Sequence, residues 1–176
     1  PHHVDVLMRP HHVLEPLATP LERNDALQRD PERLYRWIEM GVLTQVTGAS
    51  ITGLRATQCP LARNFAAWVR GPVQQAARDI YGQAIVRVET MGSYACRTVR
   101  GIASASLSEH AFANAIDVSA FVLADGRRIS VLNGWGAEGE DADFLRRIRK
   151  AACRTFQTVL SPDYNAAHRD HLHLDM

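Results

Sequence analysis

AIDVSAFVLADGRRISVL, residues 115–132, is the stretch that decides the fold. Two runs rich in apolar and β-branched residues flank an Asp-Gly pair at 125–126, which is typical of a tight turn between antiparallel strands. The stretch therefore predicts a β-hairpin. Its first strand contains one carboxylate, Asp117, between Ile116 and Val118 in an otherwise apolar run. A carboxylate in such a strand needs a partner, so the question is what Asp117 contacts.

Outside the hairpin, the pattern predicts further helices and strands around a small antiparallel sheet. Apolar spacing and helix-start signals predict four helices, over residues 31–40, 59–70, 72–82 and 140–160. The break between the second and third helices is expected at Gly71-Pro72. β-Branched, Gly-punctuated runs predict short strands within 41–54, 83–97 and 171–175. The expected architecture is α+β, with helices packed on the sheet.

Length and charge limit the classes of protein to consider. The chain has 176 residues and a formal net charge of +1, so we expect one folded domain over residues 30–176 and no nucleic-acid partner. No apolar run is long enough to span a membrane. No signal peptide is visible at Pro1, which suggests a mature or trimmed chain. The sequence does not indicate an oligomeric state.

Residues 1–29 form a proline-rich and histidine-rich segment that precedes the expected domain. Four prolines fall within the first twenty residues, which argues against regular structure there. We expect an extended arm. Metal binding by the four histidines of this segment is the less favoured alternative.

The last strand, in HRDHLHLD at residues 168–175, shows a second polar pattern. Because side chains alternate along a strand, His171, His173 and Asp175 share one face. Leu172 and Leu174 share the other face, where they can anchor the strand in the core. On its own this pattern is weak evidence for a metal site.

A histidine seven residues before Asp117 strengthens the case for metal binding. His110, Asp117 and His173 together offer two imidazoles and a carboxylate, all good zinc ligands. Three protein ligands leave a fourth position for water, the pattern of catalytic zinc, which lowers the pKa of such a water toward roughly 7. The alternative is that His110 and Asp117 only stabilise a loop and a turn.

These motifs resemble a known family. The chain is similar, over roughly residues 30–176, to the bacterial extensin-like C-terminal domain family. The matching segments, in order, are GSYACR, LSEHAFANAIDV, ADGR, FLRRIRKAACRTF and VLSPDYNAAHRDHLHLD. More distantly, Ser108, His110, Ala115 and Asp117 match a motif of D-alanyl-D-alanine peptidases. His168, His171 and His173 match the histidine spacing of the murein endopeptidase branch. Those zinc enzymes share a core with lysostaphin-type and hedgehog-type domains. Ala113 stands where that motif usually has glycine.

The resemblance implies a role for each site residue. His110, Asp117 and His173 would be the zinc ligands. Asp170 or His171 would be the general base, with His168 as a third candidate, and the choice between them stays open. The alternative for His171 is that it only supports or positions other groups of the site.

Three further residues are implied on the substrate side. Arg97 would hold the substrate carboxylate or the developing oxyanion, although a surface ion pair is an equal alternative. Ser108 would hydrogen-bond substrate or only cap its loop. Tyr94 would line the cleft or only pack.

The function implied is that of a zinc peptidase acting on peptidoglycan stem peptides or crosslinks. The alternatives are a cell-wall binding module without activity and a zinc amidase that uses the same site. The resemblance also implies a disulfide between Cys96 and Cys153. Such a disulfide fits an extracytoplasmic protein, in the periplasm or the cell envelope.

Overall fold

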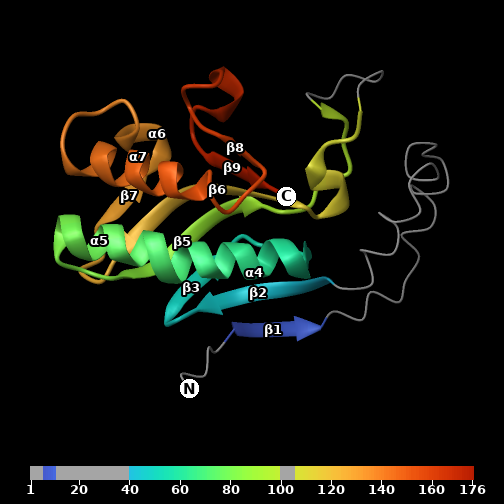
Figure 1. The fold of residues 1–176 in the computed structure, drawn as a ribbon, viewed down its shortest axis with the longest axis horizontal. Coiled ribbons are helices and arrows are strands. Elements are labelled where there is room, and N and C mark those ends of the chain that lie inside the picture. Colours follow the sequence, from blue (N-terminus) through green and yellow to red (C-terminus); the bar gives the residue numbers. More distant parts are fainter. Residues whose placement is uncertain (1–5, 11–39, 100–105) are drawn as a thin grey trace.

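The computed structural model describes residues 6–10, 40–99 and 106–176 (Figure 1). The helix predicted over 31–40 lies outside these residues, apart from Met40, which begins a strand instead. Within the predicted arm, Val6–Pro10 forms strand β1 along β2 (Met40–Val46), although its prolines argued against regular structure. Pro10 is the last residue of β1, which is the edge strand of the described sheet, where the missing N–H of proline is tolerated.

The protein is a mixed α/β structure built on one open sheet. The order of the main strands is β1-β2-β3-β5-β6-β9-β8, with β4 paired to β2 and β7 paired to β6. Pairing is antiparallel except between β3 and β5. The sheet is thus larger than expected, and mostly rather than wholly antiparallel. The remaining strands are β3 (Ala49–Thr52), β4 (Thr57–Gln58), β5 (Ile85–Gly92), β6 (Ala115–Leu123), β7 (Arg128–Ser130), β8 (Thr158–Leu160) and β9 (Leu172–Asp175).

Two hairpins have the turns that the sequence favours. The hairpin of β6 and β7 confirms the prediction for residues 115–132, except that Val131–Gly134 forms a short helix, α6. Between β2 and β3 the chain turns at Thr47 and Gly48, both with positive φ, of 47° and 83°. Positive φ at both residues of a two-residue turn suits the right-handed twist of a hairpin.

The second and third predicted helices form one continuous helical rod. Helix α4 (Cys59–Trp68) passes through a π-helical turn, η2 (Val69–Val73), into α5 (Gln74–Tyr81). The predicted break at Pro72 is therefore wrong. Proline lacks the N–H of a regular helix, and the wider turn accommodates it without ending the helix. Gly82, with φ of 66°, ends the rod.

The long C-terminal helix is shorter than predicted. Helix α7 (Glu140–Ala152) ends eight residues before the predicted end at residue 160, and the last three of those residues form β8. Val159 and its neighbours are hydrogen-bonded to β9, so pairing with the sheet overrides the helical spacing.

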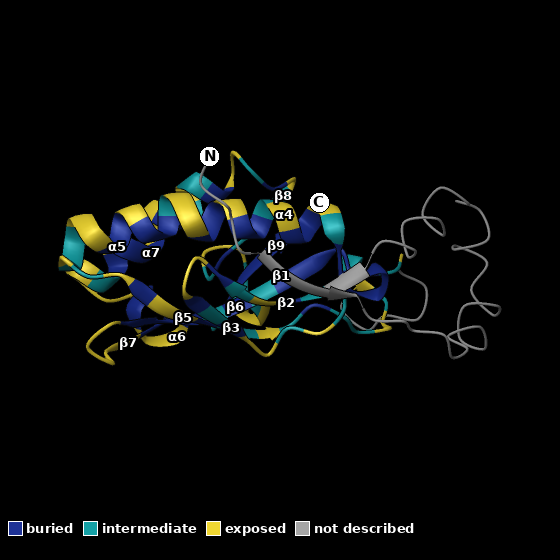
Figure 2. Cartoon of the chain, turned by 90° about the horizontal axis from the view of Figure 1, so that it is seen from below, coloured by how far each residue is buried: buried dark blue, intermediate teal, exposed yellow. Residues whose placement is uncertain are grey.

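The core lies between the sheet and the helices α4, α5 and α7, which cover one face of it (Figures 1 and 2). Trp68 lies at its centre, with ring centroids 6.1 Å from both Phe121 and Phe156. The indole Nε1 of Trp68 donates to the Ile148 carbonyl at 3.0 Å, which joins α4 to α7. No helix in the described part of the chain is long and apolar enough to cross a membrane.

Candidate metal centre

Strands β6 and β9 place two of the predicted ligands side by side. Asp117 lies directly opposite His173 in the antiparallel ladder. Their strand neighbours Ile116, Leu172 and Leu174 are fully buried in the core under the helices. Because side chains alternate across a strand, Asp117 and His173 project from the sheet face that α4, α5 and α7 leave uncovered.

The third predicted ligand, His110, lies on a short turn that leads into β6. This turn is the 3-10 helix η4 (Glu109–Phe112), and the Ser108 hydroxyl caps it by accepting from the His110 N–H at 3.3 Å. The chain then turns into β6 at Ala113, which has a left-handed backbone with φ of 54°. A non-glycine residue is disfavoured there by roughly 1–2 kcal/mol, so this backbone conformation would suit glycine better than alanine.

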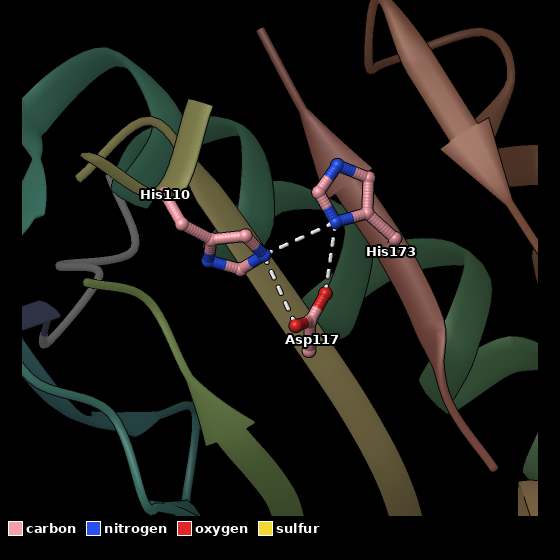
Figure 3. A group of neighbouring side chains, drawn as sticks. All are labelled: His110, Asp117 and His173. Carbon is pink, nitrogen blue, oxygen red and sulfur yellow. Dashed lines mark hydrogen bonds and ion pairs between the residues drawn. The ribbon is translucent and has the colours of Figure 1, made fainter. Parts of the chain in front are cut away.

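The three side chains converge on one point (Figure 3). His110 Nε2 lies 3.0 Å from one Asp117 oxygen, and His173 Nδ1 lies 2.9 Å from the other. The two ring nitrogens are 3.2 Å apart. Zinc–nitrogen bonds of 2.0–2.1 Å in a tetrahedron place two ligand atoms about 3.3 Å apart. The two imidazole nitrogens are therefore spaced like two corners of a zinc tetrahedron, and each lies within 3.0 Å of a different Asp117 oxygen.

The outer nitrogens of both imidazoles face oxygens. His110 Nδ1 lies 3.3 Å from the Ser93 carbonyl, and His173 Nε2 lies 3.1 Å from Asp175 Oδ2. A neutral imidazole has a single N–H. When that N–H is used on the outer oxygen, the inner nitrogen turns a lone pair toward the centre. Two lone pairs and a carboxylate then face one another, which requires a cation between them. The residues present thus fit a divalent metal ion with carboxylate-supported or carbonyl-supported histidine ligands.

Without a metal, protons would have to supply this positive charge. Burial lowers the pKa of His173, but Asp117 and Asp175 outweigh burial and raise the pKa to about 9. Burial also opposes ionisation of Asp117, yet hydrogen bonds from His110 and His173 hold the pKa of its carboxyl well below the usual range. The centre is therefore an anionic carboxylate surrounded by imidazoles, and a positive charge placed between these groups would stabilise them.

His171 and Asp170 form a pair next to the three ligands. Asp170 Oδ1 accepts from His171 Nδ1 at 2.9 Å, and this bond lowers the pKa of Asp170. The other ring nitrogen, His171 Nε2, lies 3.6 Å from Asp117. Of the two predicted bases, His171 thus reaches the centre and Asp170 contacts His171.

His168 packs against His171 and lies beside the three ligands rather than among them. Its ring centroid is 5.1 Å from that of His171 and 6.0 Å from that of His173. Its Nδ1 donates to Asn165 Oδ1 at 2.8 Å. Burial, the neighbouring histidines and the positive charge of Arg97 lower the pKa of His168, while Asp117 raises it.

The predicted substrate residues lie on the loop that follows β5. Arg97 is exposed, and its positive charge contributes to the lowered pKa of His168. No carboxylate of the described residues forms an ion pair with it. Tyr94 is partly buried, and burial raises its pKa. Ser108 is buried and caps η4, the local role that the sequence left open beside substrate binding.

The predicted disulfide is not formed. Cys96 lies on the loop after β5, and Cys153 follows the last residue of α7; both are exposed thiols. In both views the end of α7 and the loop after β5 lie well apart (Figures 1 and 2). The resemblance to the family implied the pairing but gave no distance between the two segments.

Two groups that orient the ligands were missed from the sequence. Asp175 shares the face of His173 two residues along β9, so strand alternation could have identified it as the partner of His173. The Ser93 carbonyl is a backbone group brought to His110 by the fold, and no sequence pattern marks it.

Comparisons with known proteins confirm the resemblance to the extensin-like family. The family model described as extensin-like protein C-terminus matches residues 25–176. No curated protein and no solved structure matches the chain. With almost the whole chain covered by the family model, the protein belongs to the extensin-like C-terminal family.

Proposed function

We propose that the protein is a zinc-dependent peptidase that hydrolyses amide bonds in peptidoglycan stem peptides or their crosslinks. The observation that carries the proposal is the arrangement of His110, Asp117 and His173: the two imidazole nitrogens are 3.2 Å apart, and each lies within 3.0 Å of a different Asp117 oxygen. Two of these residues are oriented from outside by the Ser93 carbonyl and by Asp175. Three protein ligands suit a catalytic rather than a structural zinc.

A zinc ion held there would supply the Lewis acidity that makes water a nucleophile near neutral pH. His171 would take the proton from the attacking water at Nε2, the nitrogen that faces the centre. Asp170 would keep the N–H of His171 on Nδ1 and stabilise the ring when it becomes positively charged. This arrangement favours His171 over Asp170 and His168 as the base.

Arg97 would bind the negative end of the substrate. It is exposed, and its positive charge acts on His168. A guanidinium can hold a carboxylate by two parallel hydrogen bonds, or support the carbonyl oxygen where charge develops. A stem peptide ends in a carboxylate, so Arg97 would orient the peptide with its scissile amide over the centre.

The substrate class rests on the resemblance to D-alanyl-D-alanine peptidases and murein endopeptidases. Under this proposal the sheet around β6 and β9 is the core shared by those enzymes, and the protein acts outside the cytoplasm. The Ser108–Asp117 motif and the histidines of residues 168–173 support this relationship.

Digestion of purified peptidoglycan tests the proposal. The zinc-loaded protein, the same protein with a chelator, and His171→Ala should be incubated with sacculi and with soluble muropeptides. We expect peptide-bond products only from the zinc-loaded protein, with the rate strongly reduced in His171→Ala although its zinc is retained. Product masses that show a cleaved sugar–peptide amide would indicate an amidase. Bound zinc with no product from any wall fraction would indicate a binding module and reject the proposal.

A further inference from the structure

Tyr164 is a large aromatic side chain at the rim of the candidate metal centre. It lies in the turn between β8 and the 3-10 helix η5 (Ala166–His168), and it is 59% exposed. Its ring meets the His168 ring edge-on, with centroids 5.7 Å apart. His168 in turn packs against His171 and His173. Aromatic contact thus runs without a break from the metal ligand His173 to an exposed ring.

The turn that presents this ring is held by groups other than the Tyr164 side chain, among them the Tyr164 N–H, which donates to the Ser161 carbonyl at 2.9 Å. The indole N–H of Trp135 donates to Asp163 Oδ1 at 2.7 Å, and Trp135 is anchored in the core. Asn165 Oδ1 accepts from the Ala167 N–H at 2.9 Å as well as from His168. Side chains on both sides of Tyr164 therefore hold the turn, and the exposed ring adds little to its stability.

An exposed ring on an anchored turn gains free energy when another group covers it. Aromatic side chains bury large apolar areas on contact and can do so at little entropic cost when the backbone is already fixed. Arg97, whose positive charge acts on the same His168 ring, is suited to the charged end of a ligand. His168 thus has an exposed aromatic ring packed on it and a cationic group near it.

We propose that Tyr164 is a substrate-contacting residue whose ring packs on the aliphatic part of the stem peptide next to the scissile amide. The proposal rests on the proposed peptidase function and adds to it a residue that sets substrate affinity. The ring would contact the peptide in the ground state and in the transition state alike, so its loss should raise KM and leave kcat almost unchanged.

The test compares three zinc-loaded variants with wild type on the soluble muropeptide that wild type cleaves fastest. Tyr164→Ala should raise KM about tenfold, a value within the range of aromatic contacts, with kcat within about twofold. Tyr164→Phe keeps the ring and should stay within about twofold of wild type in both constants. Leu132→Ala is the matched control, because Leu132 is 56% exposed on α6 and has no part in the centre.

Zinc content and melting temperature should be measured on the same samples. A wild-type KM in Tyr164→Ala would overturn the inference, and so would a loss of zinc or of thermal stability in that variant, which would indicate a structural role. A Tyr164→Phe variant as impaired as Tyr164→Ala would show that the hydroxyl matters rather than the ring, and would also overturn it. A wild-type protein that cleaves no wall fraction would reject the peptidase function itself, an outcome distinct from these.

Discussion

The two faces of strand β9 are buried to almost the same degree but by opposite means. On one face Leu172 and Leu174 have no exposed surface and pack under the helices. On the other face lie His173 and Asp175, with His171 just before the strand. All three side chains are polar, yet they are only 8 to 9% exposed. Their burial is compensated by N–H···O contacts at 2.9 to 3.1 Å.

The two faces of β9 have different roles in the site: one positions the strand, and the other supplies the chemical groups. Apolar packing behind β9 fixes where the strand lies. The register of its pairing with β6 places His173 opposite Asp117. The polar face supplies the ligands and their supporting groups. Changes on the leucine face should therefore alter stability, while changes on the histidine face should alter metal binding.

The largest expected effect is the loss of zinc from His173→Ala. His173 contacts Asp117 and lies beside His110, so its removal takes away one of three ligands. Metal analysis of the purified protein should fall from about one zinc per chain to none. Leu132→Ala, purified in parallel, should keep its zinc. Stoichiometric zinc in His173→Ala would mean that the ligand set is wrong.

On the opposite face, Leu174→Ala should reduce stability. Truncation of a fully buried leucine costs about 2–5 kcal/mol in free energy of unfolding. Urea denaturation of the metal-free protein measures this, with the exposed Leu132→Ala expected to change stability by less than about 0.5 kcal/mol. At low urea the variant should still bind zinc, because its ligands are intact. A folded Leu174→Ala that binds no zinc would contradict the division between the two faces.

Zinc affinity should also depend on pH. The pKa of His173 is raised to about 9 by its two carboxylate neighbours against the effect of burial. Below that pH the ring is protonated in the metal-free protein, and zinc must displace the proton. Affinity should therefore rise about tenfold per pH unit from pH 7 and level off near pH 9. Chelator competition at several pH values, corrected for the ionisation of the chelator, measures this. An affinity independent of pH would show that His173 binds no proton that zinc must displace.

The smallest effect is expected from Asp175→Asn, which changes a group behind a ligand. Asp175 accepts from His173 Nε2 and keeps Nδ1 available to the metal. Loss of such a supporting carboxylate typically weakens metal binding about 10–100-fold, and zinc should still bind at saturation. Asp143→Asn, on an exposed position of α7, serves as the control. An unchanged zinc affinity in Asp175→Asn would show that Asp175 has no part in orienting His173.

Much of this arrangement could be predicted from local sequence patterns. The hairpin of β6 and β7, the alternation of β9, and the spacing of His110 and Asp117 depend on contacts near in sequence. Two errors arose where contacts distant in sequence decide the structure. Pairing with β9 makes Val159 part of a strand, and Cys96 and Cys153 lie on separate parts of the fold. The error at Pro72 was local, because a π-helical turn continues the helix through the proline. The Ser93 carbonyl, which contacts His110 Nδ1, also comes from a distant segment, directly after the end of β5.

Strand β9 comes last among the strands along the sequence but sits inside the sheet, between β6 and β8. Pairing of Asp117 with His173 closes a loop of more than fifty residues, a slow and entropically costly step in folding. The early hairpins can form without it, whereas the ligand set cannot. The metal centre therefore exists only in a chain in which β9 has paired with β6, so a partly folded chain without this pairing cannot carry the chemistry of the native one.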